Sequence, residues 1–104
     1  LEVLAGFKGG RKVLVTPGLV ELGDREDEEN KKLGVLASRV CDLVFLIGPE
    51  RTKAIFEGLR ENGFPEQNIF IEKSLREAMG KFGDLLKVGD VVLFENDLPD
   101  TYNE

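Results

Sequence analysis

Carboxylate and amide side chains gather in two segments of the 104-residue chain, and these groups are well suited to bind a ligand. The first segment contains Glu21 and the acidic run from Asp24 to Glu29, and the second contains Asn96 and Asp97. Two carboxylate-rich loops at one crevice could hold the ammonium group of a substrate or an arginine from another domain. The acidic run is also typical of a solvated helix start, because carboxylates suit the positive end of the helix dipole.

Two glycines frame the first part of this region. Gly18 and Gly23 follow the apolar run that ends at Thr16. Glycine adopts a positive φ without steric cost, and its missing side chain also lets a ligand approach the backbone closely. The sequence leaves both roles open for each glycine.

Several catalytic arrangements are excluded by what the chain lacks. It has no histidine, so Ser-His-Asp catalysis, Cys-His catalysis and histidine-based metal sites cannot be built from its own residues. It also lacks the Gly-x-x-x-x-Gly-Lys-Ser/Thr phosphate loop and a Gly-x-Gly-x-x-Gly motif after the first apolar run. We therefore expect no catalytic residue, metal or cofactor in this chain by itself, and no ATP hydrolysis.

Composition limits the class of partner. With 14 basic and 20 acidic residues the net charge is -6, which disfavours nucleic acid and anionic membranes, because both attract clustered lysine and arginine. The single cysteine, Cys41, follows an apolar helical stretch and is interpreted as a small buried apolar residue. No run approaches the roughly 18 apolar residues of a membrane span, and no signal-peptide pattern opens the chain, so we expect a cytoplasmic protein.

Four short apolar runs alternate with amphipathic stretches, a pattern typical of βαβ units with a parallel sheet covered on both faces. The expected strands are residues 12–16, 42–47, 68–71 and 90–95. Helices are expected to begin near residues 26–29, at Pro49 and at Ser74, the second ending at Gly63. Their predicted buried residues are Leu33, Leu36, Ala37 and Val40 in the first, Ile55 and Leu59 in the second, and Leu75, Ala78, Met79, Phe82 and Leu86 in the third.

Right-handed crossovers then favour a Rossmann-like α/β domain with three layers and strand order 3-2-1-4. In that order the loops that leave the first and fourth strands face each other at the switch point of the sheet, where such folds bind ligands. We expect residues 1–10 to be the end of an interdomain helix or linker and residues 11–104 to form the domain, which suggests a piece of a longer protein.

The spacing of Glu21-Leu22-Gly23, Asn30 and Gly34 resembles the carboxy-terminal domain of the Mur ligases. Residues 42–48 and 87–93 extend this resemblance, which is nearest to the branch that adds D-alanyl-D-alanine to the UDP-N-acetylmuramoyl-tripeptide. The resemblance implies a Rossmann-like final domain that delivers an amino-acid or dipeptide substrate and closes over a central ATPase domain. The implied chemistry is activation of a carboxylate as an acyl phosphate, followed by attack of an amine.

The resemblance also implies a set of substrate-binding residues and cofactors. ATP and Mg²⁺ would be held mainly by the central domain of the full-length enzyme. The substrate-binding residues expected in this chain are Glu21, Gly23, Asn30 and Asn96 from the resemblance, and Gly18 and Asp97 from their places in the loops after the first and fourth predicted strands.

The chain departs from the dipeptide-adding enzymes at three places. It has Pro17-Gly18 in place of their Gly-Asp, Asn30 in place of a histidine, and residues 95–98 in place of a basic Lys-Gly-Ser-Arg segment. Another amino substrate is therefore open. The alternatives are a free-standing doubly wound ligand-binding or regulatory module without catalysis, and a protein-interaction domain. A phosphorylated receiver domain is disfavoured because no acidic pair follows the first predicted strand.

Overall fold

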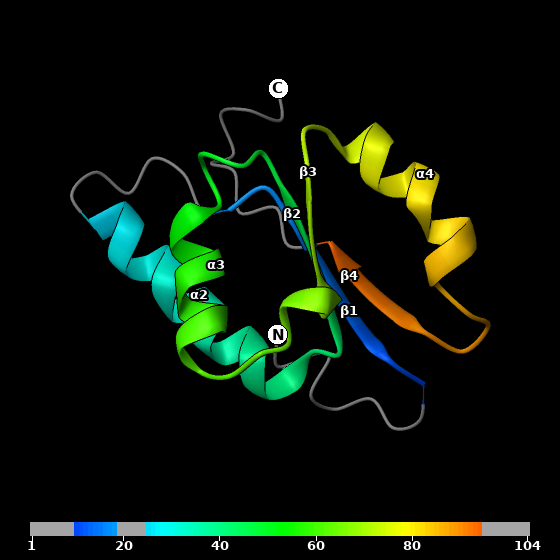
Figure 1. The fold of residues 1–104 in the computed structure, drawn as a ribbon, viewed down its shortest axis with the longest axis horizontal. Helices are drawn as coiled ribbons and strands as arrows, with labels where there is room; N and C mark the ends of the chain where they lie inside the picture. Colours follow the sequence, from blue (N-terminus) through cyan, green and yellow to red (C-terminus); the bar gives the residue numbers. More distant parts are fainter. Residues whose placement is uncertain (1–9, 19–24, 95–104) are drawn as a thin grey trace.

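The computed structural model describes residues 10–18 and 25–94, which form an α/β unit of three layers (Figure 1). Its sheet contains the parallel strands β1 (Lys12–Thr16), β2 (Leu43–Ile47), β3 (Ile69–Glu72) and β4 (Val91–Phe94). Their order is β3-β2-β1-β4, which confirms the predicted fold class and topology. Val15 lies opposite Phe45 on β2 and opposite Phe94 on β4, so β1 is central.

Helices α2 (Glu26–Val40) and α3 (Lys53–Glu61) cover one face of the sheet, and α4 (Leu75–Leu85) covers the other (Figure 1). A short 3₁₀ helix, η2 (Glu66–Asn68), leads into β3. The predicted helix signals are present. Ser74 accepts a hydrogen bond from the Glu77 N–H at the start of α4, and Gly63 follows α3 with a φ of 78°.

The start of α3 differs from the prediction. The sequence predicted a helix that begins at Pro49, but α3 begins only at Lys53, after a turn that follows β2. Gly48 has a φ of 89°, and its carbonyl accepts bonds from the Thr52 N–H at 3.1 Å and the Thr52 hydroxyl at 2.8 Å. These two bonds close a separate turn before the helix, which is why proline does not occupy its first position.

Each face of the sheet has its own apolar core. The core under α2 and α3 consists mainly of Leu14, Val44 and Leu46 from the sheet and of Ile55 and Leu59 from α3. On the opposite face Phe45 stacks on Phe70 at 4.8 Å between ring centroids and meets the edge of Phe82 at 5.0 Å. The inner strands β1 and β2 are therefore buried from both sides, as their nearly continuous apolar sequences predicted, whereas the edge strands β3 and β4 are only partly buried.

Helices α2 and α3 approach each other at a pair of glycines. A methyl group added at Gly58 would lie 3.1 Å from the Val35 nitrogen and 3.2 Å from the Gly34 Cα, and it would overlap the Lys31 carbonyl oxygen. A methyl group added at Gly34 would overlap the carbonyl oxygen of Ile55. The two backbones are thus in contact, with no space for a side chain between them.

Three residues predicted to be buried are substantially exposed. Leu36 is 43% exposed, Leu75 42% and Met79 54%. On α2 the buried face consists of small or short residues, Asn30, Gly34 and Ala37, because the helices touch there, and this rotates Leu36 outward. On α4 only Ala78 is fully buried, so Leu75 and Met79 flank the contact with the sheet.

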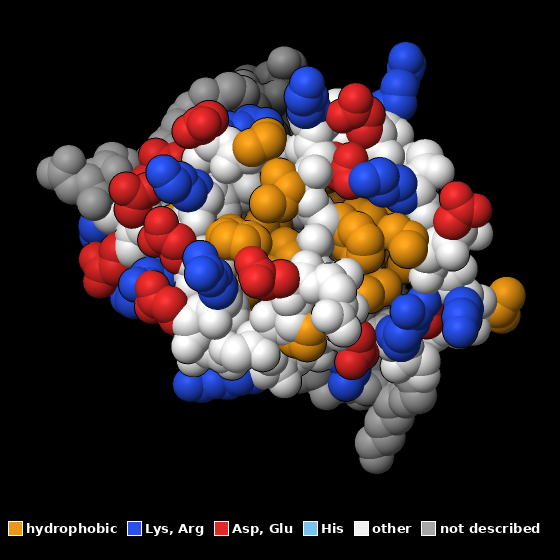
Figure 2. Space-filling view, in the orientation of Figure 1, with side chains coloured by type: hydrophobic (Ala, Val, Ile, Leu, Met, Phe, Trp, Pro, Cys, Tyr) orange, Lys and Arg blue, Asp and Glu red, His pale blue; other side chains and the backbone are white. Residues whose placement is uncertain are grey.

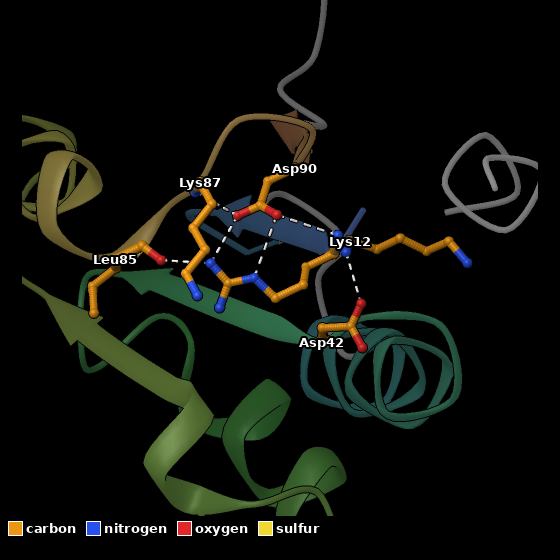
Figure 3. A network of polar contacts seen from close by, with 6 residues as sticks. Lys12, Asp42, Leu85, Lys87 and Asp90 are labelled. Carbon is orange, nitrogen blue, oxygen red and sulfur yellow. Dashed lines mark hydrogen bonds and ion pairs between the residues drawn. The ribbon is translucent and has the colours of Figure 1, made fainter. Parts of the chain in front are cut away.

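An ionic cluster joins the chain segments at the amino ends of β1 and β4 (Figure 3). The Arg11 guanidinium donates to Asp90 Oδ2 at 2.8 Å and to the Leu85 carbonyl at 2.6 Å. Asp90 Oδ2 also accepts from the Lys87 N–H at 2.8 Å. The hydrogen bond from Arg11 holds the pKa of Asp90 down at about 2, with further help from the Lys87 N–H. This cluster lies at the amino edge of the sheet, opposite to the carboxyl edge where the candidate site described below is located.

Candidate functional site

The carboxyl ends of the parallel strands form the edge where an α/β sheet usually binds its ligand. Strand β1 ends there at Thr16, which is fully buried. Its hydroxyl accepts a hydrogen bond from the Gly18 N–H at 3.0 Å, so a short turn fixes the direction in which the chain leaves the sheet.

Gly18 and Asn30, two of the predicted site residues, lie together at this edge. Gly18 has a φ of 88°, and a methyl group added there would lie 3.4 Å from Asn30 Oδ1 and 3.2 Å from the Arg51 carbonyl oxygen. Asn30 is 1% exposed. The Gly18 backbone therefore packs against α2 and against the loop before α3. Its positive φ favours glycine, and the close Arg51 carbonyl leaves little room for a side chain.

Arg51 is a functional candidate that the sequence analysis missed. Its exposed guanidinium lies over Gly48, with Nε and Nη2 each 3.0 Å from the place that a Gly48 side chain would occupy. No ion pair joins Arg51 to a carboxylate among residues 10–18 and 25–94. Its cation is thus available at the carboxyl edge. The signal in the sequence was Gly-Pro-Glu-Arg directly after a buried strand.

An open groove of about 570 Å³ lies beside this corner, between the first turns of α2 and α3. Its described lining is mostly charged and consists of Asp27, Glu28, Lys31, Glu50, Lys53, Ala54 and Glu57. Part of the predicted acidic run thus faces a groove. Asp27 and Glu28 are also exposed in the first turn of α2, as a solvated helix start would be.

The other four predicted substrate-binding residues lie outside the described residues. These are Glu21, Gly23, Asn96 and Asp97. The sheet does place the ends of β1 and β4 side by side, with Val15 opposite Phe94. The strands that precede the two predicted loops are therefore neighbours, as the sequence analysis required.

Two further groups near the sheet are accounted for by packing and by an ion pair. Cys41 is buried with the α2 and α3 core, and burial raises the pKa of its thiol to about 11, so it is an apolar packing residue as expected. At the end of β3 the Lys81 ammonium lies 2.6 Å from Glu72 Oε2, a buried atom, although the direction of approach does not satisfy hydrogen-bond geometry. Within the described ranges, no group of three or more His, Cys, Asp or Glu residues is arranged to hold a metal ion.

None of the described helices is both long and apolar enough to cross a membrane. Comparison of the whole chain with known protein families gives no match, and comparison with curated proteins gives none either.

Proposed function

We propose that this chain is the carboxy-terminal, amino-substrate-binding domain of a cytoplasmic Mur-type ligase that forms an amide bond at the expense of ATP. The observation that carries the proposal is the corner formed by Gly18, Asn30 and Arg51 at the carboxyl edge of a 3-2-1-4 parallel sheet. Asn30 was expected to bind substrate from the resemblance, and Gly18 from its place in the loop after the first strand. The third supplies a cation that no described carboxylate neutralises.

The charges near this corner suit a substrate with both an amine and a carboxylate. The groove between α2 and α3 carries the carboxylates of Asp27, Glu28, Glu50 and Glu57. Arg51, in the loop that leads into α3, offers a planar guanidinium that pairs with carboxylate in a bidentate geometry. An amino acid or dipeptide has an ammonium group for the acidic side and a carboxylate for Arg51. D-Alanyl-D-alanine is one such substrate, and other amino substrates satisfy the same chemistry.

The residues that carry the resemblance also have clear structural roles. Gly34 allows α2 to touch α3, and Asn30 is buried beneath the turn that leaves β1. Their spacing therefore reflects how the domain places its ligand edge. In the proposed full-length enzyme, ATP and Mg²⁺ would be held mainly by a central ATPase domain, and this domain would bring the amine to the activated carboxylate.

The binding step can be tested with the isotope-labelled 104-residue chain by nuclear magnetic resonance. D-Alanyl-D-alanine should shift the amide signals of Gly18, Gly48 and Arg51, whereas its carboxy-amide should shift them much less because the carboxylate is gone. Arg51→Ala should weaken dipeptide binding about tenfold, the loss of one charge-assisted contact. Arg60→Ala, which removes an exposed arginine at the other end of α3, is the matched control.

The results separate the proposed function from its alternatives. If ATP shifts the same amide signals and no amino acid or dipeptide does, the carboxyl edge serves closure over the nucleotide and not binding of the amino substrate. No response to either class of ligand would favour a free-standing regulatory module. The gene that encodes this chain provides an independent test, since a ligase requires a Gly-x-x-Gly-Lys-Thr/Ser segment upstream of it and ATP-dependent activity of the full-length protein.

A further inference from the structure

Strand β3 forms one edge of the sheet, and no other described strand pairs with its outer backbone side. The Glu72 carbonyl accepts a hydrogen bond from the Gly48 N–H at 2.8 Å, so the backbone groups of Glu72 point toward β2. These groups alternate in direction along a strand. Phe70 therefore also points its N–H and carbonyl toward β2, while Ile69 and Ile71 point theirs away from the sheet.

This edge is apolar on both sides. Figure 2 shows hydrophobic side chains on either side of a strip of backbone at the centre of the view, where Figure 1 places β3. Ile71 is 45% exposed, and Ile69 and Phe70 are half-buried. Proteins usually protect an exposed edge with charges, proline or a bulge. The sequence Ile69-Phe70-Ile71 contains none of these.

We propose that β3 pairs in an antiparallel direction with β3 of a second copy of this chain. A twofold axis perpendicular to the sheet, midway between the two strands at Phe70, places Phe70 opposite its counterpart. The same axis places Ile69 opposite Ile71 of the second copy. In this register the outward backbone groups of both isoleucines face each other and form four N–H···O bonds, and the two sheets become one sheet of eight strands.

The occupant is a second copy because the edge is complementary to itself. The three central pairs, formed by Ile69, Phe70 and Ile71, are all apolar. The next pair places Glu72, whose carboxylate is paired with Lys81 of its own chain, opposite Asn68 of the second copy, so no unpaired charge is buried between the strands. The amino end of the segment carries the exposed Glu66, and the carboxyl end carries the exposed Lys73. Antiparallel pairing places the acidic end of each copy beside the basic end of the other, whereas a parallel neighbour of the same sequence would align like charges.

The first test measures the mass of the 104-residue chain by sedimentation equilibrium over a range of concentrations. The wild-type chain should dimerise, and Ile71→Lys should be monomeric, because it adds a charge at the centre of the pairing. Met79→Lys alters an even more exposed apolar residue on α4 and should leave the dimer intact. Circular dichroism checks that both variants are folded. A monomeric wild-type chain at every concentration would overturn the proposal.

Charge reversal tests the antiparallel arrangement itself. Glu66→Lys and Lys73→Glu should each weaken the dimer severalfold, and the double variant should restore it. Hydrogen exchange supplies a second readout, since the amides of Ile69 and Ile71 should become protected as concentration rises. Failure of the double variant to recover, or dissociation by Met79→Lys but not by Ile71→Lys, would place any dimer contact elsewhere and refute the pairing.

Discussion

The close contact between α2 and α3 predicts that changing glycine to alanine destabilises the fold at Gly34 but stabilises it at Gly80, which lies away from this contact. Gly34→Ala adds a methyl group that overlaps the Ile55 carbonyl oxygen and lies 3.0 Å from the carbonyl carbon and 3.1 Å from the Leu59 nitrogen. These are backbone atoms, so the clash cannot be relieved by rotating a side chain. Gly80 lies within α4 and has no atom within 4 Å of the added methyl group.

The size of each effect follows from these contacts. Overpacking costs about 1 to 3 kcal/mol, and a backbone contact belongs at the upper end of that range. Alanine recovers about 1 kcal/mol through its better helix propensity. We expect Gly34→Ala to lower the free energy of unfolding by about 2 kcal/mol, which lowers the melting temperature by about 10 °C in a chain of this size. Gly80→Ala should raise the free energy of unfolding by about 1 kcal/mol.

Urea and thermal unfolding of the 104-residue chain, followed by circular dichroism, measure both variants. Gly58→Ala should resemble Gly34→Ala, because its methyl group overlaps the Lys31 carbonyl oxygen. The double variant should lose less than the sum of the two single losses, since separating the helices once makes room for both methyl groups. If Gly34→Ala is as stable as Gly80→Ala, the helices do not touch as described and the reasoning fails.

Three further predictions concern other parts of the fold. Arg11 holds the pKa of Asp90 at about 2, below the ordinary carboxyl value. The ionised Asp90 therefore stabilises the folded chain above about pH 4, and this stabilisation is lost as the pH falls toward 2. The difference in urea midpoint between wild type and Asp90→Asn should shrink over that range. Cys41, with its pKa raised to about 11, should react with a thiol reagent at pH 8 far more slowly in the folded chain than in urea, and equal rates would contradict its burial. Gly18→Val should lower the free energy of unfolding by about 2 kcal/mol, because the branched valine would have to adopt a positive φ. Asp27 is exposed, so Asp27→Ala should change the free energy of unfolding by less than about 0.5 kcal/mol. Calorimetry that ranks the two losses in reverse order would refute the role of the turn.

The sequence determined the order and type of the elements because their signals are local. The first strand was predicted with its observed bounds, Lys12–Thr16, since a short β-branched run buried on both faces has a distinctive composition. The handedness of parallel crossovers then selected the observed strand order. Ser74 and Gly63 marked a helix start and a helix end through hydrogen bonds and backbone angles that depend on a few adjacent residues.

Only the tertiary structure decided which residues of each helix are buried and which meet at the candidate site. Helical periodicity favoured the large residues Leu36 and Met79, but Gly34 lies at the contact because backbones approach closely only where side chains are small. Asn30 and Arg51 are 21 positions apart, and both pack at Gly18 because β1 and β2 are neighbours in the sheet. A local pattern carries no information about such a contact, since it depends on how whole elements pack in three dimensions.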